Sequence, residues 1–355
     1  MKQYQLIGFA DMMTQSRKIK SQFFAQINEL VDWRPISNII NKHYQKGMSV
    51  DGRPSYDGLL LFKMSLLQTW YGLSDYEVED RLNDSLSFSR FVGLSLDKTS
   101  PDHSVLSSFR TELTQKAVYE KLFKELNKQL EKHKIIIKTG AIVDASITPS
   151  PLKPKGKATY QITEDRSEVE PTLEENQKEQ KAVELLKIVQ PGVDTEASWV
   201  KKAGKLQYGF KKHVVSDNEG MAIGVLTTTA KVNEISNLEE VLATADLPNG
   251  IGLFADKGYA SAKNRELLKS KKMKDRILKR AIKEKPLTDR EKQFNKLAGK
   301  VRYKIERVFG SIKRWFNSEK ARYRGLAKTH TQHLMEAMAY NLYRSPGIVM
   351  SNRKI

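Results

Sequence analysis

The chain lacks cysteine altogether. Its 355 residues offer no thiol, so disulfide bonds, thiolate catalysis and cysteine-ligated zinc sites are excluded. No apolar run approaches the roughly 18 residues that a membrane-spanning helix requires. The first residues, MKQYQLIGFADMMTQ, also lack the apolar segment of a secretory signal. We therefore expect no membrane partner and a cytoplasmic location.

Acidic residues are scarce relative to basic ones. The sequence has 42 Asp+Glu against 61 Lys+Arg, which gives a formal net charge of +19. An excess of this size favours a polyanionic partner, most often nucleic acid. An anionic membrane surface is the alternative, but neither end of the chain carries a basic amphipathic anchor.

The first third of the chain has the pattern of short helices joined by tight turns. Ser74 forms a capping box with Glu77, and Ser100 followed by Pro101 predicts a second helix start. The helix after Pro101 carries Arg110, a candidate DNA contact. The arrangement fits either a helix-turn-helix DNA reader or a plain helical bundle.

From residue 135 the pattern changes to strands. The segment IIIKTGAIVDASITPS is rich in β-branched residues and predicts a buried strand. A polar interval at about 152–204 follows, which we interpret as a solvated insertion or a mobile loop. Two further strand-like runs flank the turn signal DNEG, and strands and helices then alternate. Residues 211–213 lie on the strand before that turn.

The order of elements predicts the fold class. Three initial strands joined by hairpins and then a βαβα series match a ribonuclease-H-like fold. We therefore expect an α+β protein with a mixed five-stranded sheet and flanking helices. The expected boundaries are a helical domain at 1–134, the ribonuclease-H-like domain at 135–345, and a tail at 346–355. Within the second domain we expect a helix capped by Asn233 or Ser236, a helix capped by Ser261, and a helix at 301–318.

Three carboxylates stand out in this second domain. Asp144 lies inside an apolar strand, where a desolvated charge needs a partner. Asp256 ends the short strand IGLFAD, and open sheets place ligands at such strand ends, although a turn residue is the simpler interpretation. Glu306 shares one edge of a helix with Arg302 and Lys313, although an i,i+4 ion pair with Arg302 also explains it.

Taken together, these three carboxylates suggest a metal site. Two aspartates on neighbouring strands and a glutamate on a packing helix can converge on hard divalent cations such as Mg²⁺. Two such ions about 3.5–4 Å apart can clamp the attacking and leaving oxygens of a phosphoryl transfer. Surrounding basic residues would then hold a phosphodiester backbone.

At these residues the chain resembles DDE transposases of bacterial insertion sequences, of the insertion-sequence-5 type. The resemblance covers most of the chain and is carried by the order and spacing of several short blocks. The blocks are RPSYDGLLLFKMSLLQTWYGLSDYEVEDRL, IVDASITPSP, WVKKAGKLQYGFKKHVVSDNEG, LFADKGYASAKNREL, RYKIERVFGSIKRWF and RYRGLAKTHTQHLMEAMAYNL. In such proteins the first block belongs to the helical domain that binds transposon ends.

The resemblance implies particular site residues. It assigns Asp144, Asp256 and Glu306 as the catalytic, metal-binding triad for two Mg²⁺ ions, which Mn²⁺ could replace. The glutamate block of the family carries a Tyr-x2-Arg-x3-Glu-x6-Lys pattern. Arg302 and Lys313 occupy its basic places, as DNA contacts, whereas Gly299 stands at the tyrosine place. The departure concerns a phosphate-contacting hydroxyl and not the metal site.

Further DNA contacts are expected from basic residues near the aspartates. Lys211, Lys212 and His213 cluster on one strand and either contact DNA near Asp144 or face solvent from an edge strand. Lys257 and Tyr259 follow Asp256, and each is either a contact to the cleaved strand or a turn residue.

The resemblance implies a function with two alternatives. The expected enzyme binds terminal inverted repeats in double-stranded DNA, cleaves at the ends and joins the 3′-hydroxyls to target DNA, acting as a homodimer in the bacterial nucleoid. The alternatives are a catalytically silent DNA-binding repressor and a nuclease that only hydrolyses. An intact triad argues against the repressor, and the basic helical region argues against the nuclease.

Overall fold

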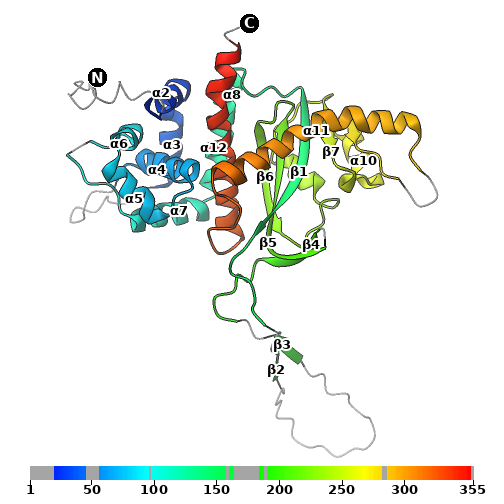
Figure 1. Cartoon of the computed structure of the whole chain (residues 1–355), viewed down its shortest axis with the longest axis horizontal. Helices are drawn as coiled ribbons and strands as arrows, with labels where there is room; N and C mark the ends of the chain where they lie inside the picture. Colours follow the sequence, from blue (N-terminus) through cyan, green and yellow to red (C-terminus); the bar gives the residue numbers. More distant parts are fainter. Residues whose placement is uncertain are drawn as a thin grey trace, which may run out of the picture.

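The computed structural model describes most of the chain. The described ranges are 20–44, 56–95, 97–156, 160–163, 184–187, 190–202, 204–281 and 286–352. A group of helices lies on one side and a twisted sheet on the other, and the last helix runs between them (Figure 1). Within these ranges no helix is long and apolar enough to cross a bilayer.

Seven helices make up the described part of the N-terminal region. They are α2 (Lys20–Leu30), α3 (Trp33–His43), α4 (Gly58–Tyr71), α5 (Asp75–Asp84), α6 (Leu86–Val92), α7 (His103–Gln115) and α8 (Val118–Lys132). The predicted capping box of Ser74 and Glu77 is confirmed at the start of α5. The predicted start of α7 at Pro101 is wrong. Asp102 caps that helix instead, because its carboxylate accepts a hydrogen bond from the amide of Val105 at 2.9 Å.

The sheet has the predicted mixed topology. Its five main strands are β1 (Gly140–Pro149), β5 (Lys205–Asp217), β6 (Ala222–Thr229), β7 (Gly252–Ala255) and β8 (Lys274–Ile277). They lie in the order β6-β5-β1-β7-β8, and β5 is antiparallel to its neighbours while β1, β7 and β8 are parallel. This order and polarity confirm the ribonuclease-H-like expectation. A sixth strand, β4 (Ser198–Lys202), pairs with the first residues of β5.

The polar interval is not wholly an insertion. The residues of β4 lie near its end and pair with β5, so the interval contributes a strand to the main sheet. Its described parts also include the two-stranded pair β2 (Tyr160–Thr163) and β3 (Glu184–Lys187). Residues 164–183 of this interval, which we expected to be solvated or mobile, lie outside the described residues.

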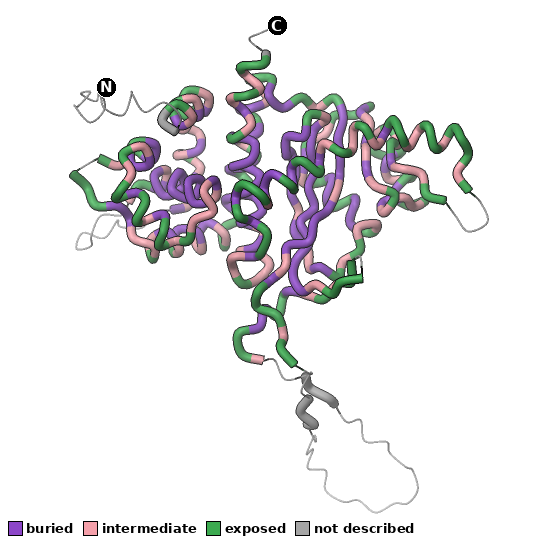
Figure 2. Tube along the Cα trace, viewed as in Figure 1, coloured by how far each residue is buried: buried purple, intermediate pink, exposed green. Residues whose placement is uncertain are grey.

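Helices cover both faces of the sheet. Alternate residues of β1 point to opposite sides, as strand geometry requires: Val143 joins one apolar cluster and Ile142 the other. The cluster around Val143 includes α9 (Leu238–Ala243) and α10 (Ala262–Ser270), and the cluster around Ile142 includes α11 (Asp289–Trp315) and α12 (Leu326–Asn352). Figure 2 shows buried residues running through the sheet and the helices beside it.

Two predicted helix starts are wrong and one is confirmed. Ser261 caps α10 as expected. Neither Asn233 nor Ser236 caps α9, because Asn237 precedes the helix and Asn233 instead accepts the amide of Ile235 within the preceding turn. The helix expected from residue 301 begins 12 residues earlier, at Asp289, behind a capping box that starts at Thr288.

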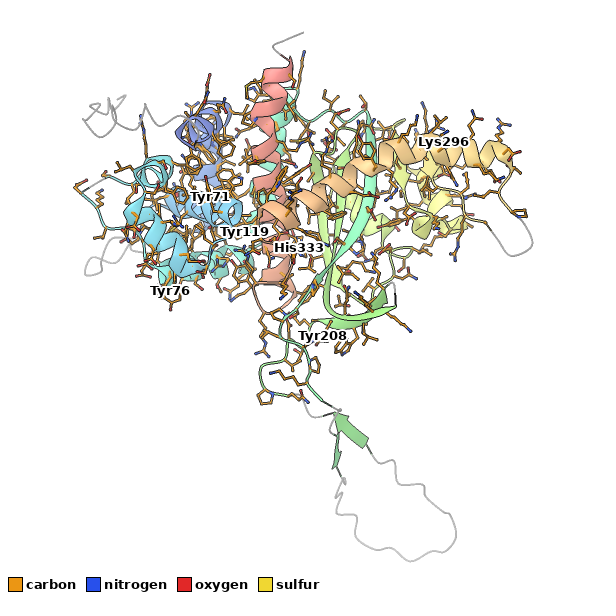
Figure 3. All side chains as sticks on the ribbon, viewed as in Figure 1. Tyr71, Tyr76, Tyr119, Tyr208, Lys296 and His333 are labelled. Carbon is orange, nitrogen blue, oxygen red and sulfur yellow. The ribbon has the colours of Figure 1, made fainter. Side chains whose placement is uncertain are left out.

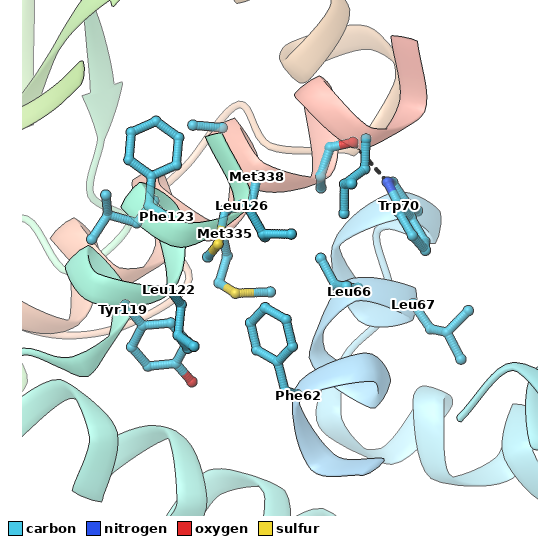
Figure 4. Close-up of a cluster of buried hydrophobic side chains, with 14 of the residues drawn as sticks. Phe62, Leu66, Leu67, Trp70, Tyr119, Leu122, Phe123, Leu126, Met335 and Met338 are labelled. Carbon is cyan, nitrogen blue, oxygen red and sulfur yellow. Dashed lines mark hydrogen bonds between the residues drawn. The ribbon is translucent and has the colours of Figure 1, made fainter. Parts of the chain in front are cut away.

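A shared core joins the helical region to the sheet. Helix α12 extends to Asn352 and so includes residues 346–352 of the expected tail. It contributes Met335 and Met338 to the same apolar cluster as Phe62 of α4. In the close-up of Figure 4, these side chains meet between the helices, and Trp70 Nε1 donates to Ala339 O at 2.8 Å. The two expected domains therefore share one core, since the end of the chain returns to the N-terminal helices.

Candidate active site

Strand register places Asp144 and Asp256 next to each other. In the parallel pair of β1 and β7, Val143 lies opposite Ala255, and each aspartate is the following residue. Asp256 then leaves the sheet and caps a short 3-10 helix, η1 (Lys257–Tyr259), by accepting the amide of Lys257 at 2.6 Å. Two carboxylates 112 residues apart in the sequence, 256 minus 144, thus lie side by side where β7 ends next to the middle of β1.

Glu306 approaches this pair from helix α11. The Arg302 guanidinium lies between the two acidic groups, with Nη1 3.0 Å from Asp144 Oδ2 and Nη2 2.5 Å from Glu306 Oε1. The i,i+4 ion pair between Arg302 and Glu306 is therefore present. Arg302 also pairs with Asp144 of β1, so it links α11 to this strand.

The electrostatics around Asp144 reflect burial among other carboxylates. Burial raises the pKa of Asp144, the Ala145 amide and Arg302 lower it, and the charges of Glu234 and Asp256 raise it further. Among the described residues, no three carboxylate or histidine side chains are placed to hold one ion. That the three carboxylates share a cation stays a prediction. In this structure the Arg302 guanidinium lies between Asp144 and Glu306.

Glu234 is a carboxylate of this site that the sequence did not single out. It lies between β6 and α9, with Oε1 3.5 Å from Lys211 Nζ. Its Oε2 lies 3.6 Å from the position of a Cβ built on Gly258, so a larger side chain at 258 would contact the carboxylate. The only sequence signal was an acidic residue in the turn before a helix, which is common at helix starts.

Tyr259, also considered as a contact to the cleaved strand, closes the turn after Asp256, because its amide donates to Asp256 O at 2.9 Å. Its side chain is fully buried, and its hydroxyl has no hydrogen-bond partner among the described residues. Burial raises the pKa of this hydroxyl well above its ordinary value, and the charges of Glu234, Asp144 and Asp256 raise it further. A tyrosine hydroxyl can donate one hydrogen bond, and here that donor is unused among the described residues.

The basic cluster on β5 is buried. Lys211 donates to Val232 O at 2.7 Å, and Lys212 lies 2.5 Å from Glu336 of α12. His213 is fully buried beside Thr228, and burial lowers its pKa to about 3. The alternative of a solvent-facing edge strand is wrong, because β5 has neighbours on both sides. A DNA-binding role for the three stays a prediction that their burial does not favour.

The pair of Lys212 and Glu336 belongs to a polar network between the sheet and α12. Ser318 donates to Glu336, and Gln332 Nε2 donates to the same carboxylate at 2.8 Å. His333, labelled in Figure 3, forms hydrogen bonds with Thr148 of β1 and Thr227 of β6. Together these contacts attach α12 to the strand that carries Asp144.

The remaining candidates differ in exposure. Lys257 is exposed beside Asp256, and Lys313 is half-buried on α11, where burial and the neighbouring Lys212 lower its pKa. Arg110 is buried: its Nη2 lies 2.6 Å from Asp75 Oδ2, and its Nη1 donates to the Tyr323 hydroxyl at 2.7 Å. It links α7 to the chain before α12, so its predicted DNA contact would require this link to open.

Comparisons with known proteins give consistent family matches. A family model described as "Transposase DDE domain" matches residues 137–342, more than half of the chain, and one described as "Transposase domain (DUF772)" matches residues 12–112. The structure is also similar to a piggyBac transposase synaptic complex with hairpin DNA, at 11% identity, covering 96% of this chain and 77% of that one, with a TM-score of 0.40. A Mos1 strand transfer complex matches at 10% identity over 96% and 95% of the two chains, with a TM-score of 0.20. Likenesses this low do not by themselves indicate a shared activity.

Proposed function

The chain belongs to the DDE transposase family, and from this premise we propose that it moves an insertion sequence of the insertion-sequence-5 type. It would bind the terminal inverted repeats, cleave at the ends and join the exposed 3′-hydroxyls to target DNA. The observation that carries this proposal is the placement of Asp144, within β1, beside Asp256, at the end of β7, with Glu306 linked to Asp144 through Arg302.

The donor groups suit hard divalent cations. Asp144, Asp256 and Glu306 offer carboxylate oxygens, the ligands that Mg²⁺ and Mn²⁺ prefer. The negative charge of Glu234 adds to a site that favours positive charge. Two Mg²⁺ ions held there would stabilise the charge that develops on phosphate oxygens during cleavage and joining.

The basic residues of the chain have their own part in this proposal. Arg302 now neutralises Asp144 and Glu306, and a cation held by these carboxylates would release the guanidinium to contact a DNA phosphate. Lys257, exposed beside Asp256, would hold the backbone of the cleaved strand. Lys313 would contact the same backbone further along α11.

DNA binding rests on the charge of the whole chain and on its helical region. A net charge of +19 supplies the long-range attraction to a polyanion. The helices that match the second transposase domain would read the terminal repeats. Two element ends require two active sites, so we propose a homodimer on paired ends.

A strand-transfer assay tests the proposal. The full chain is incubated with Mg²⁺, labelled terminal-repeat DNA and a target plasmid. Joined products support the transposase, bare nicks support the nuclease, and shifted but uncut DNA supports the repressor. Asp256→Ala should abolish cleavage and leave end binding intact, because the lost carboxylate is a proposed metal ligand and not a DNA contact.

The matched control is Asp246→Ala. Asp246 is another aspartate of this region, but its side chain is fully exposed and only distantly paired with Lys138, at 3.7 Å. This variant should cleave at the wild-type rate. Normal cleavage by Asp256→Ala would refute the assignment of the active site.

A further inference from the structure

The hydroxyl of Tyr259 has an unusual environment for a core tyrosine. The ring packs among apolar side chains such as Ala255 and Leu268, and none of its surface is exposed. A buried tyrosine hydroxyl normally finds a hydrogen-bond partner, yet this one has none among the described residues. Apolar packing alone would be served equally well by phenylalanine.

The surroundings of this hydroxyl are acidic and held in place. Three carboxylates, those of Glu234, Asp144 and Asp256, lie close enough to act on it electrostatically. The Asn264 side chain connects the segment that carries Glu234 to the turn that carries Tyr259. Its Nδ2 donates to Ile235 O at 3.0 Å and to Tyr259 O at 2.8 Å. Tyr259 N also donates to Asp256 O at 2.9 Å, which closes the turn between them.

We infer that Tyr259 is a positioning residue whose hydroxyl donates a hydrogen bond to the carboxylate site only when that site holds a divalent cation. The inference rests on the proposed function, since it concerns the same aspartates. A protonated phenol is a donor that cannot compete for the cation with its own negative charge. Donors of this kind orient the carboxylates that hold a metal. In this structure Asp144 pairs with Arg302, and Asp256 accepts a hydrogen bond from the amide of Lys257. Glu234 pairs with Lys211, so the hydroxyl has no partner among the described residues.

Tyr119 provides a matched control within the same chain. It is also a buried tyrosine with an unpartnered hydroxyl among the described residues, but it lies on α8, among the helices (Figure 3). The groups that act electrostatically on its hydroxyl are Arg110 and Tyr323, and no carboxylate of the site is among them. Tyr119→Phe and Tyr259→Phe therefore remove the same group, but only Tyr259→Phe removes it near the carboxylates of the site.

The test uses Mn²⁺ as the probe and the full chain without DNA. Mn²⁺ binding is measured by calorimetric titration and by the paramagnetic resonance signal of the free ion, and unfolding temperature is measured in EDTA. Tyr259→Phe should weaken Mn²⁺ binding about 10- to 100-fold, as loss of an outer hydrogen bond to a metal ligand does. It should unfold in EDTA no earlier than the wild type. Tyr119→Phe should leave Mn²⁺ binding unchanged.

The outcomes separate this inference from the proposed function. If Tyr259→Phe binds Mn²⁺ like the wild type while Asp256→Asn loses binding, the role of Tyr259 is refuted and the metal site stands. If Tyr259→Phe unfolds much earlier in EDTA, the hydroxyl has a structural partner and the inference also fails. If the wild type binds no Mn²⁺, both the inference and the proposed metal site are wrong.

Discussion

Replacing Lys212 by methionine should destabilise the protein, because Lys212 forms a buried ion pair with Glu336. The Lys212 ammonium lies 2.5 Å from Glu336, and the two side chains are only 4% and 2% exposed. Methionine keeps most of the unbranched stem but removes the charge. Glu336 then remains in the core with hydrogen bonds from Ser318 and Gln332 but without its cation.

The size of the effect follows from the burial of the pair. Removing one member of a buried ion pair costs about 3–5 kcal/mol, because the other charge stays desolvated and uncompensated. The two remaining hydrogen bonds to Glu336 place the expected loss near the lower end of that range. In the double variant Lys212→Met/Glu336→Gln no charge is stranded, so a coupling of about 0.5–3 kcal/mol should be recovered.

Chemical denaturation and DNA titration together test this reasoning. The free energy of unfolding is measured for both variants and for Lys201→Met, an exposed lysine on β4 whose loss should change stability little. DNA affinity is measured as a function of salt under conditions where each variant is folded. If Lys212→Met is as stable as the wild type but loses about one unit of salt slope, Lys212 is a phosphate contact and our structural interpretation is wrong.

Three further predictions concern charge and titration. Binding to terminal-repeat DNA should weaken linearly in log K against log salt, about 10³–10⁵-fold between about 50 and 200 mM for six to ten phosphate contacts; a flat plot in a mobility-shift titration would contradict a basic DNA-binding surface. His213 has a pKa of about 3 in the folded protein and about 6.5 when unfolded. Below pH 6.5 the unfolded chain therefore takes up a proton that the folded chain does not, and stability falls as the pH falls toward 3. His213→Leu should show a shallower loss of unfolding free energy over this window, and equal slopes would disprove the reasoning. Arg302→Gln removes the charge that pairs with Asp144 and Glu306, so it should tighten Mn²⁺ binding in calorimetry while slowing DNA cleavage. Unchanged Mn²⁺ affinity would show that the guanidinium does not compete with the cation.

Local patterns in the sequence predicted the elements that depend on near neighbours. The β-branched run around Asp144, the DNEG turn and the caps at Ser74 and Ser261 all act within a few residues of themselves. The order of these elements was enough for the ribonuclease-H-like topology. Where two polar residues competed for one helix start, as at Ser100 and Asp102, the sequence pattern failed, because the winner depends on which oxygen reaches the free amides.

The sequence alone determined which residue types stand at strand ends and helix edges, and thereby the family and the three acidic candidates. Only the tertiary structure decided what surrounds them. The burial of Lys212 and His213, the bridging position of Arg302, and the approach of Glu234 and Tyr259 arise from contacts between segments distant in the sequence. The physical reason is that strand pairing and helix packing set which side chains lose water, and a pattern along the chain contains no record of what packs against it.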